Sequence, residues 1–408
     1  MNHLSLPGMA SPLRRFFLFS VFFVLAAVCA SGAHAQRVWG VNGHPDDSDY
    51  AVWNNPEEIR KQLDYLKELG SPYYRISFSA SKNDPRILKW LVDEIHARQD
   101  KVKLVPVVFA DVVPSAGYQS NYDAGYAQGK RWAEFALSLP GSQNIITHWE
   151  LGNETSLARF NGKPMFGLVT DGQGKVVGNP LRTDGWEDKI PGSTEAMAGM
   201  LRGLYWGIKN AYKAPATTQI LFGDLWIHFG YVQKLKEVRG AQFLPADILS
   251  WHWYAPRFGS FTAPLVAGDR TTSPAAYASR FGKKIWVTEI GREDKAIQDG
   301  KEFPIGGSAT NLYNTNQNWA YQADALMGEL NDLVGEPAVT GIFVYQLYDE
   351  TLKLQKAPLL EKVSQEYHGL VSGEILSTPV PAGQLPKVAR YRKNAFYTYR
   401  DYIRSHPW

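Results

Sequence analysis

Short apolar runs alternate with longer amphipathic stretches along most of the chain. Eight runs are rich in β-branched and aromatic residues, and several are apolar on both faces, as parallel strands buried between two layers are. We predict strands that begin at Arg37, Pro72, Val102, Ile145, Gln219, Asp247, Lys283 and Val339.

The stretches between these runs have the pattern of helices. The segment from Pro56 starts with proline, has two acidic residues in its first turn and ends at Gly70, and each feature favours a helix. We predict further helices from Asp84, Gly192, Asn316 and Ala389. Strands that alternate with helices in this way predict an α/β protein, a single-domain (β/α)8 TIM barrel. That fold needs about 250 residues, which leaves the remainder for long loops.

The surplus residues follow the fourth, seventh and eighth predicted strands, at about 155–191, 291–316 and 349–388. In a TIM barrel the segments after the strands build the active site, so these loops are expected to wall a cleft. Within the first of them, the run from Phe166 predicts a β-hairpin that turns at Asp171-Gly172. A doubly wound open sheet is the alternative fold, but no phosphate-binding loop follows the first strand.

The first 35 residues differ in character from the rest. Arg14 and Arg15 precede an apolar run at 16–30, and Ala33-His34-Ala35 fits a signal-peptidase site. The run is short for a membrane-spanning helix, which needs about 20 apolar residues. We therefore expect a signal peptide at 1–35 and one exported domain at 36–408, periplasmic or secreted and not stably inserted in a membrane. An uncleaved anchor is the alternative.

Composition narrows the choice of partners and cofactors. The 43 basic and 40 acidic residues give a net charge of +3 without runs of like charge, so neither nucleic acid nor an anionic membrane is an expected partner. The one cysteine, Cys29, lies in the predicted signal peptide. The histidines are scattered and no metalloprotease, serine-hydrolase or nucleotide-binding motif is present, so we expect no cofactor and no metal centre, with an oxygen-ligated Ca²⁺ left open.

Two glutamates end predicted strands and suggest a chemistry. Glu154 closes HWELGNE at the fourth strand and Glu289 closes IWVTE at the seventh, and these strand ends face each other across the mouth of a barrel. Retaining hydrolysis of a glycosidic bond needs two carboxyls about 5–5.5 Å apart. One protonates the leaving oxygen and the other attacks the anomeric carbon. A single glutamate at a strand end is more often a helix cap or half of a salt bridge, so the pair carries the prediction.

HWELGNE, the TEIG strand end and His252-Trp253-Tyr254 between them resemble clan A glycoside hydrolases, retaining (β/α)8 enzymes that include families 5 and 39. The resemblance covers the chain from Arg37 as a strand pattern. It implies that Glu154 is the acid/base and that Glu289 is the nucleophile.

The resemblance also implies supporting residues. Asn153 would hydrogen-bond the sugar 2-hydroxyl, Tyr254 would donate to the nucleophile, and Arg75 would keep the nucleophile ionised. Arg75 is equally a candidate for a structural ion pair with Glu150 inside the barrel. His252 is expected to be a hydrogen-bonded core or subsite residue rather than a metal ligand.

Other residues are candidates for substrate contact. The first strand ends near Asn42 and His44 at the predicted barrel mouth. Many clan members carry a tryptophan platform on the eighth strand, whereas this chain has VYQLYDE there, so Tyr345, Gln346 or Tyr348 is expected to line that subsite. The candidates for stacking on sugars are Trp186, Trp226 and Trp253, and each is as well suited to the core.

Together these features predict an exported, monomeric, retaining β-glycoside hydrolase that acts on a β-linked oligo- or polysaccharide, in endo fashion on a polymer. Three alternatives stay open: an exo-β-glycosidase, a transglycosylase with the same carboxylates, and a non-catalytic glycan-binding barrel in polysaccharide assembly.

Overall fold

The computed structural model describes residues 37–45, 56–77, 85–212, 218–254, 259–265, 272–291, 295–298, 301–304, 316–348, 369–375 and 388–407. The chain divides into the units Met1–Arg37 and Val38–Trp408, and the fold below is that of the second unit. The predicted signal peptide lies outside the described residues, as do most of 291–316 and 349–388. Among the helices that are described, none has both the length and the apolar character needed to span a bilayer.

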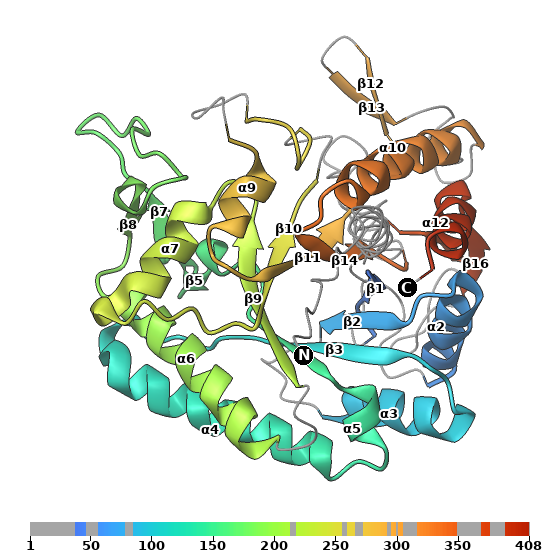
Figure 1. Ribbon diagram of the computed structural model, residues 1–408, viewed down its shortest axis with the longest axis horizontal. Coiled ribbons are helices and arrows are strands. Elements are labelled where there is room, and N and C mark those ends of the chain that lie inside the picture. The colour runs from blue at the N-terminus through green and yellow to red at the C-terminus, as the bar shows by residue number, and fades with distance from the viewer. Residues whose placement is uncertain are drawn as a thin grey trace, which may run out of the picture. The chain divides into compact units, whose positions relative to one another are not determined.

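Within the described residues, eight parallel strands close into a barrel (Figure 1). Neighbouring strands follow the order β1-β14-β11-β10-β9-β4-β3-β2. All eight predicted strands and the TIM barrel are thereby confirmed, and the closed sheet excludes the doubly wound alternative. The strands are β1 (Val38–Gly43), β2 (Tyr73–Ser77), β3 (Lys103–Val108), β4 (His148–Leu151), β9 (Gln219–Leu225), β10 (Ile248–His252), β11 (Lys284–Ile290) and β14 (Val339–Val344).

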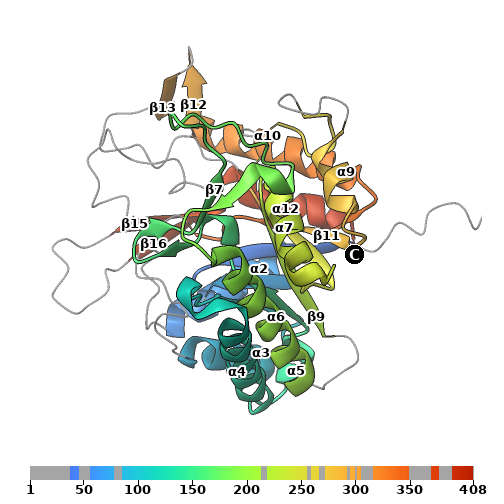
Figure 2. The ribbon, with the colours of Figure 1, turned by 90° about the vertical axis from the view of Figure 1, so that its left-hand side faces the viewer.

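Helices pack around the barrel (Figures 1 and 2). They are α2 (Pro56–Leu69), α3 (Arg86–Arg98), α4 (Gly117–Leu137), α5 (Ser142–Ile145), α6 (Ser193–Ala211), α7 (Phe229–Glu237), α9 (Pro274–Ser279), α10 (Asn316–Val334) and α12 (Asn394–Ser405). The helices predicted from Pro56, Asp84, Gly192 and Asn316 are confirmed. The start predicted at Ala389 is wrong, because Val388–Arg392 forms strand β16 and the helix begins at Asn394. Helix α4 was not predicted.

The described residues also form two-stranded antiparallel sheets outside the barrel. They pair β5 (Arg159–Phe160) with β6 (Lys163–Pro164), β7 (Phe166–Leu168) with β8 (Trp186–Asp188), β12 (Lys295–Gln298) with β13 (Lys301–Pro304) and β15 (Val371–Ile375) with β16. The predicted turn after Asp171 is present, because its carboxylate accepts from the N–H groups of Gln173 and Lys175. The predicted hairpin is present next to this turn, where Thr170 pairs antiparallel with Val176, but it does not include β7, which pairs with β8.

Large side chains fill the inside of the barrel. Trp286 and Phe343 pack there with Val105, Leu221 and Ile248. Glycines on neighbouring strands make the room: a Cβ on Gly40 would overlap the Phe343 ring, and one on Gly341 would press on the Trp286 indole. Because these apolar side chains fill the barrel interior, the polar side chains that could meet a ligand lie at the ends of the strands.

Candidate active site

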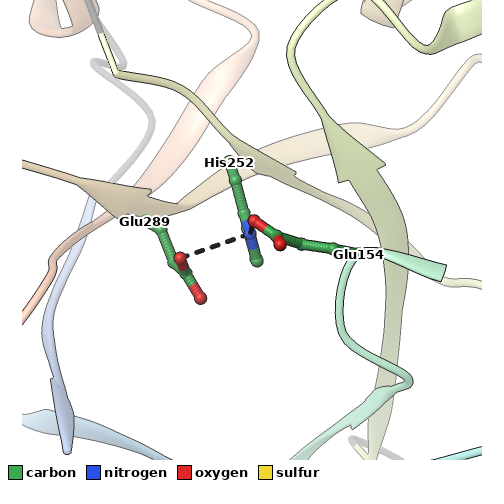
Figure 3. A group of neighbouring side chains, drawn as sticks. All are labelled: Glu154, His252 and Glu289. Carbon is green, nitrogen blue, oxygen red and sulfur yellow. Dashed lines mark hydrogen bonds and ion pairs between the residues drawn. The ribbon is translucent and has the colours of Figure 1, made fainter. Parts of the chain in front are cut away.

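The carboxyl ends of the barrel strands bring polar side chains from distant parts of the sequence together. Glu154 follows β4, His252 ends β10, and Glu289 lies near the end of β11. Figure 3 shows the two carboxylates on either side of the His252 ring. The predicted pair of glutamates therefore meets at one site.

The spacing of the pair suits retaining chemistry. One carboxylate oxygen each from Glu154 and Glu289, and one ring nitrogen of His252, all lie within 4.8 Å of one another. Retaining glycosidases hold their carboxyls about 5–5.5 Å apart, whereas inverting enzymes need about 6.5–9.5 Å to admit a water. The Glu154 side chain is 25% exposed and that of Glu289 is 7% exposed, so the pair lies at the boundary between the barrel and solvent.

Glu289 is held through both carboxylate oxygens. Arg75 Nη1 donates to Oε1 at 2.7 Å, and the Tyr254 hydroxyl donates to Oε2 at 2.7 Å. Burial raises the pKa of Tyr254 well above its ordinary value, and the charge of Glu289 raises it further. The phenol therefore keeps its proton and remains a donor to Glu289.

Arg75 is the hub beneath the site, and its side chain is only 1% exposed. It forms an ion pair with Glu150 through Nε, and it donates to the side-chain oxygens of Asn42 at 2.7 Å and Asn153 at 2.8 Å. Burial lowers the pKa of Arg75, but Glu150 and Glu289 outweigh it and raise that pKa above its ordinary value. The two roles considered for Arg75 thus coexist, and both place it under the site rather than in contact with a ligand.

His252 bridges the two glutamates. Its Nδ1 lies 3.0 Å from Glu154 Oε1 and 3.3 Å from Glu289 Oε2. Its Nε2 lies 3.3 Å from Arg75 Nη2, which can only donate, so the network assigns the ring hydrogen to Nδ1. Burial lowers the pKa of His252, but the Glu289 charge and the hydrogen bond to Glu154 raise it above its ordinary value.

The same three side chains are close enough together to consider a metal ion. A metal-bound histidine normally donates its second ring N–H to an acceptor. His252 Nε2 instead faces Arg75, whose guanidinium also occupies one oxygen of Glu289. A further cation would meet that charge, so the donor set fits a hydrogen-bond network and not a metal centre.

The backbone around Glu154 is unusual. Gly152 has φ +72°, and Glu154 itself has φ +47° and ψ +53°, in the left-handed region. Side chains rarely adopt that region without support from neighbours. The turn leads into a short 3₁₀ helix (Thr155–Leu157) and directs Glu154 toward His252.

The remaining residues predicted to contact substrate lie partly at the barrel mouth and partly inside the barrel. The partly exposed rings of Tyr254, Tyr345 and His44 follow one another edge to face, with centroids 6.4 Å and 5.8 Å apart. Asn42 is 1% exposed and donates to the Thr288 carbonyl, so it lies below this row.

The three tryptophans considered for sugar stacking also separate. Trp186 and Trp253 are buried and pack against neighbouring aromatic rings, which favours their core role. Trp226 is partly exposed and follows β9, and its backbone N–H donates to the His252 carbonyl. It is therefore the better placed of the three to meet a ligand.

One buried acid was missed from the sequence. Asp224 of β9 is 2% exposed and binds the residues directly after Glu154. The signal was available in QILFGDLWI, because a lone carboxylate inside an apolar strand needs a polar partner.

No protein-family model matches the chain, and no curated protein matches its sequence. Solved structures share its architecture. A β-glucuronidase from an uncultured Clostridium species matches with a TM-score of 0.51 and 13% identity, over 91% of this chain and 50% of that one. A β-glucuronidase from Ruminococcus gnavus matches with a TM-score of 0.50 and 10% identity, over 90% and 50%. A β-glucosidase from Thermotoga maritima gives 0.49 and 11%, over 91% and 98%.

The chain spans about half the length of the two glucuronidases. At this level of identity the likeness shows a shared barrel fold.

Proposed function

We propose that this protein is a retaining β-glycoside hydrolase. The observation that carries the proposal is the approach of the Glu154 and Glu289 carboxylates to within 4.8 Å at the ends of β4 and β11. That separation supports a double displacement, because it leaves room for a sugar carbon but not for an additional water between the carboxyls.

In the first step Glu289 attacks the anomeric carbon while the Glu154 carboxyl gives its proton to the leaving oxygen. The glycosidic bond breaks and a glycosyl ester forms on Glu289. In the second step Glu154, now a carboxylate, takes a proton from water, which attacks the same carbon and releases Glu289. Arg75 and Tyr254 hold the two oxygens of Glu289 in place throughout.

Asn153 and Tyr345 complete the proposed sugar site. The Asn153 side-chain oxygen accepts from Arg75, which leaves its amide N–H groups as the donors for a sugar hydroxyl. Tyr345 follows the eighth barrel strand and lies beside Tyr254, at the place where many members of the clan that the sequence resembles carry tryptophan. We propose that its ring lines the subsite in place of that platform.

We further propose membership of the clan A group that includes families 5 and 39, endo action on a β-linked polysaccharide, export through cleavage after Ala35 and a monomeric state. The motifs around Glu154 and Glu289 support the first point, and the N-terminal sequence supports export. The sugar is to be identified with a panel of aryl β-glycosides and β-linked polysaccharides. Aryl β-glucuronides belong in that panel, because two similar structures are named as β-glucuronidases.

The decisive experiment uses a 2-fluoro aryl β-glycoside of the preferred sugar, followed by peptide mass spectrometry. An adduct on Glu289 is expected, because the fluorine slows both steps while a good aryl leaving group speeds only the formation of the ester. Nuclear magnetic resonance should show the β-anomer as the first product. Glycan binding without hydrolysis and without labelling would favour the non-catalytic barrel, and an α-anomer as first product would contradict retention.

A further inference from the structure

Asp224 lies under the turn that carries Glu154. It belongs to β9, the strand next to β4 in the barrel, and it is 2% exposed. Its carboxylate accepts hydrogen bonds from Ser156 N at 2.8 Å, Ser156 Oγ at 2.7 Å, Thr155 Oγ1 at 3.2 Å and Leu225 N at 2.9 Å. Most of these donors belong to the two residues directly after Glu154.

The turn requires such support. Glu154 occupies the left-handed region with φ +47°, where a side chain with a Cβ is disfavoured. Gly152, two residues earlier, has φ +72°, so two of three successive residues adopt a positive φ. Glu154 is a quarter exposed and its side chain meets His252 at the mouth, so the restraint on its backbone comes from the buried residues that follow it.

His228 is a second partner of the same turn and lies beside Asp224, with its Nδ1 3.5 Å from Asp224 Oδ1. The Ser156 hydroxyl lies 2.7 Å from His228 Nδ1 as well as 2.7 Å from Asp224 Oδ1. Because the hydroxyl gives its one hydrogen to the carboxylate, His228 donates to it. Trp186 packs edge to face on the His228 ring at 4.7 Å. Ser156 is thus held by a buried acid and a packed imidazole that lie side by side.

We propose that Asp224 is a positioning residue for the acid/base: by clamping Thr155 and Ser156 it fixes the backbone of Glu154 and aims its carboxyl at the glycosidic oxygen. This inference rests on the proposed function, because only a proton donor needs that aim. Asp224 touches neither reacting carboxylate in the described contacts and acts through the turn.

The role predicts a dependence on the leaving group. General acid assistance matters for a poor leaving group, such as phenol, and little for 2,4-dinitrophenol. In Asp224→Asn, kcat/KM on the phenyl β-glycoside should therefore fall roughly 10- to 100-fold, within the range of about 10²–10⁴ that full acid–base catalysis supplies. On the dinitrophenyl glycoside of the same sugar kcat/KM should fall less than about threefold.

Two further measurements separate positioning from general damage. Ser156→Ala removes one oxygen from the clamp and should show the same leaving-group dependence at smaller size, also if Asp224→Asn fails to fold. Azide, which attacks without a base, should raise kcat on the dinitrophenyl glycoside in both variants, as it should in Glu154→Ala.

The matched control is Asp332 in α10. It holds another turn in the same manner, accepting from Ser260 Oγ at 2.7 Å, from Phe261 N at 2.8 Å and from the Thr262 hydroxyl. Asp332→Asn should leave the ratio of the two kcat/KM values as in the wild type.

Equal losses on both glycosides in the Asp224 and Ser156 variants, or a changed ratio in Asp332→Asn as well, would overturn the positioning role. If the wild type hydrolyses no glycoside in the panel and takes up no label on Glu289, the proposed function itself fails and this role fails with it. If the wild type is active and takes up the label, but the ratio of the two kcat/KM values is unchanged in the Asp224 and Ser156 variants, only the positioning role fails.

Discussion

The two glutamates differ in how firmly they are held. Glu289 receives Arg75 on one oxygen and Tyr254 on the other, and its side chain is 7% exposed. Glu154 meets His252 and is 25% exposed. A nucleophile has to hold one line of attack and keep its charge, whereas an acid/base has to exchange protons with water. The surroundings of the two carboxylates match those separate demands.

This difference leads to a prediction for the pair. Glu289→Ala should abolish turnover of every glycoside, because no glycosyl ester can form. Glu154→Ala should retain most of the glycosylation rate on a dinitrophenyl glycoside and lose roughly 10²–10⁴-fold on a phenyl glycoside, because only the latter needs the proton. Steady-state kinetics with both substrates test this. Near-complete and equal losses in both variants on the dinitrophenyl glycoside would contradict the assigned roles.

Tyr345 provides a second prediction at the scale of a residue. Its ring is partly exposed and meets the edges of His44 and Tyr254. Tyr345→Ala should lower kcat/KM by roughly 10- to 100-fold, since an aromatic ring in a binding site contributes about 1–3 kcal/mol. Tyr345→Phe is the matched control and should stay within a few-fold of the wild type. Loss of activity in both variants would assign the effect to the hydroxyl instead.

The sequence predicted the meeting of the two glutamates and the contacts of Arg75 and Tyr254 with Glu289, but not every part of the network. Glu154 and Glu289 stand in recognisable strand ends, so their meeting followed from the strand count. The hydrogen bond between Arg75 and Asn153 and the clamp by Asp224 could not be predicted, because they depend on side-chain direction across neighbouring strands. The left-handed backbone of Glu154 has no signature in the sequence, although Gly152, two residues earlier, indicates a tight turn.

Among the elements, helices α4 and α6 pack with their backbones in close approach (Figure 1). Glycines on both helices form the contact, and a Cβ on any of them would overlap a backbone oxygen of the other helix. These positions are Gly125, Gly129, Gly199, Gly203 and Gly207. This contact explains why α4 was not predicted. Glycine is usually unfavourable inside a helix, but here the close approach of the α6 backbone requires it.

Gly203→Ala should therefore destabilise the protein, although alanine favours helix formation. A Cβ at residue 203 would overlap the Tyr122 carbonyl oxygen, and forcing extra volume into a packed contact costs about 1–3 kcal/mol. The matched control is Gly328→Ala in α10, where a Cβ would meet no atom within 4 Å, and it should stabilise by about 0.5–1 kcal/mol. Urea unfolding of both variants measures the free energy of unfolding. Stabilisation by Gly203→Ala would show that the two helices can move apart.

The C-terminal segment shows where local pattern misleads. From Ala389 a short strand-like alternation of apolar and basic residues runs directly into a helical pattern, and Val388–Arg392 pairs with Val371–Ile375 as a small sheet. Pairing with a distant segment decides this, and the helix starts only at Asn394. Propensity alone could not place that boundary.

At the scale of the molecule, barrel closure creates the site. Arg75 and Glu289 are 214 positions apart in sequence and 2.7 Å apart in space. The resemblance to clan A implied this meeting, and barrel closure explains it, because strands two and seven lie on either side of strands one and eight. The sequence predicted less about the long segments after strands four, seven and eight, since they carry few periodic positions.

The opposite end of the barrel contains a partly buried titratable group, His148. His148 begins β4, stacks on Trp286 at 4.5 Å and meets Tyr73 edge to face at 5.5 Å. Its Nδ1 lies 2.9 Å from the Thr147 hydroxyl. Burial lowers the pKa of His148 to about 4, and the charge of Asp247 opposes that shift. The folded barrel therefore keeps this imidazole neutral well below the pH at which an unfolded chain would protonate it.

The lowered pKa makes stability depend on pH with a definite sign. Between about pH 6.5 and 4 His148 is protonated in the unfolded chain but not in the folded barrel. The free energy of unfolding therefore falls as pH falls across this window. In His148→Gln, the loss of unfolding free energy between pH 7 and 4.5 should be smaller than in the wild type by about 2–3 kcal/mol. Urea unfolding at both pH values measures it, with the exposed His96→Gln as control. If His148→Gln and the wild type lose the same free energy, protonation of His148 does not limit the acid stability of the barrel.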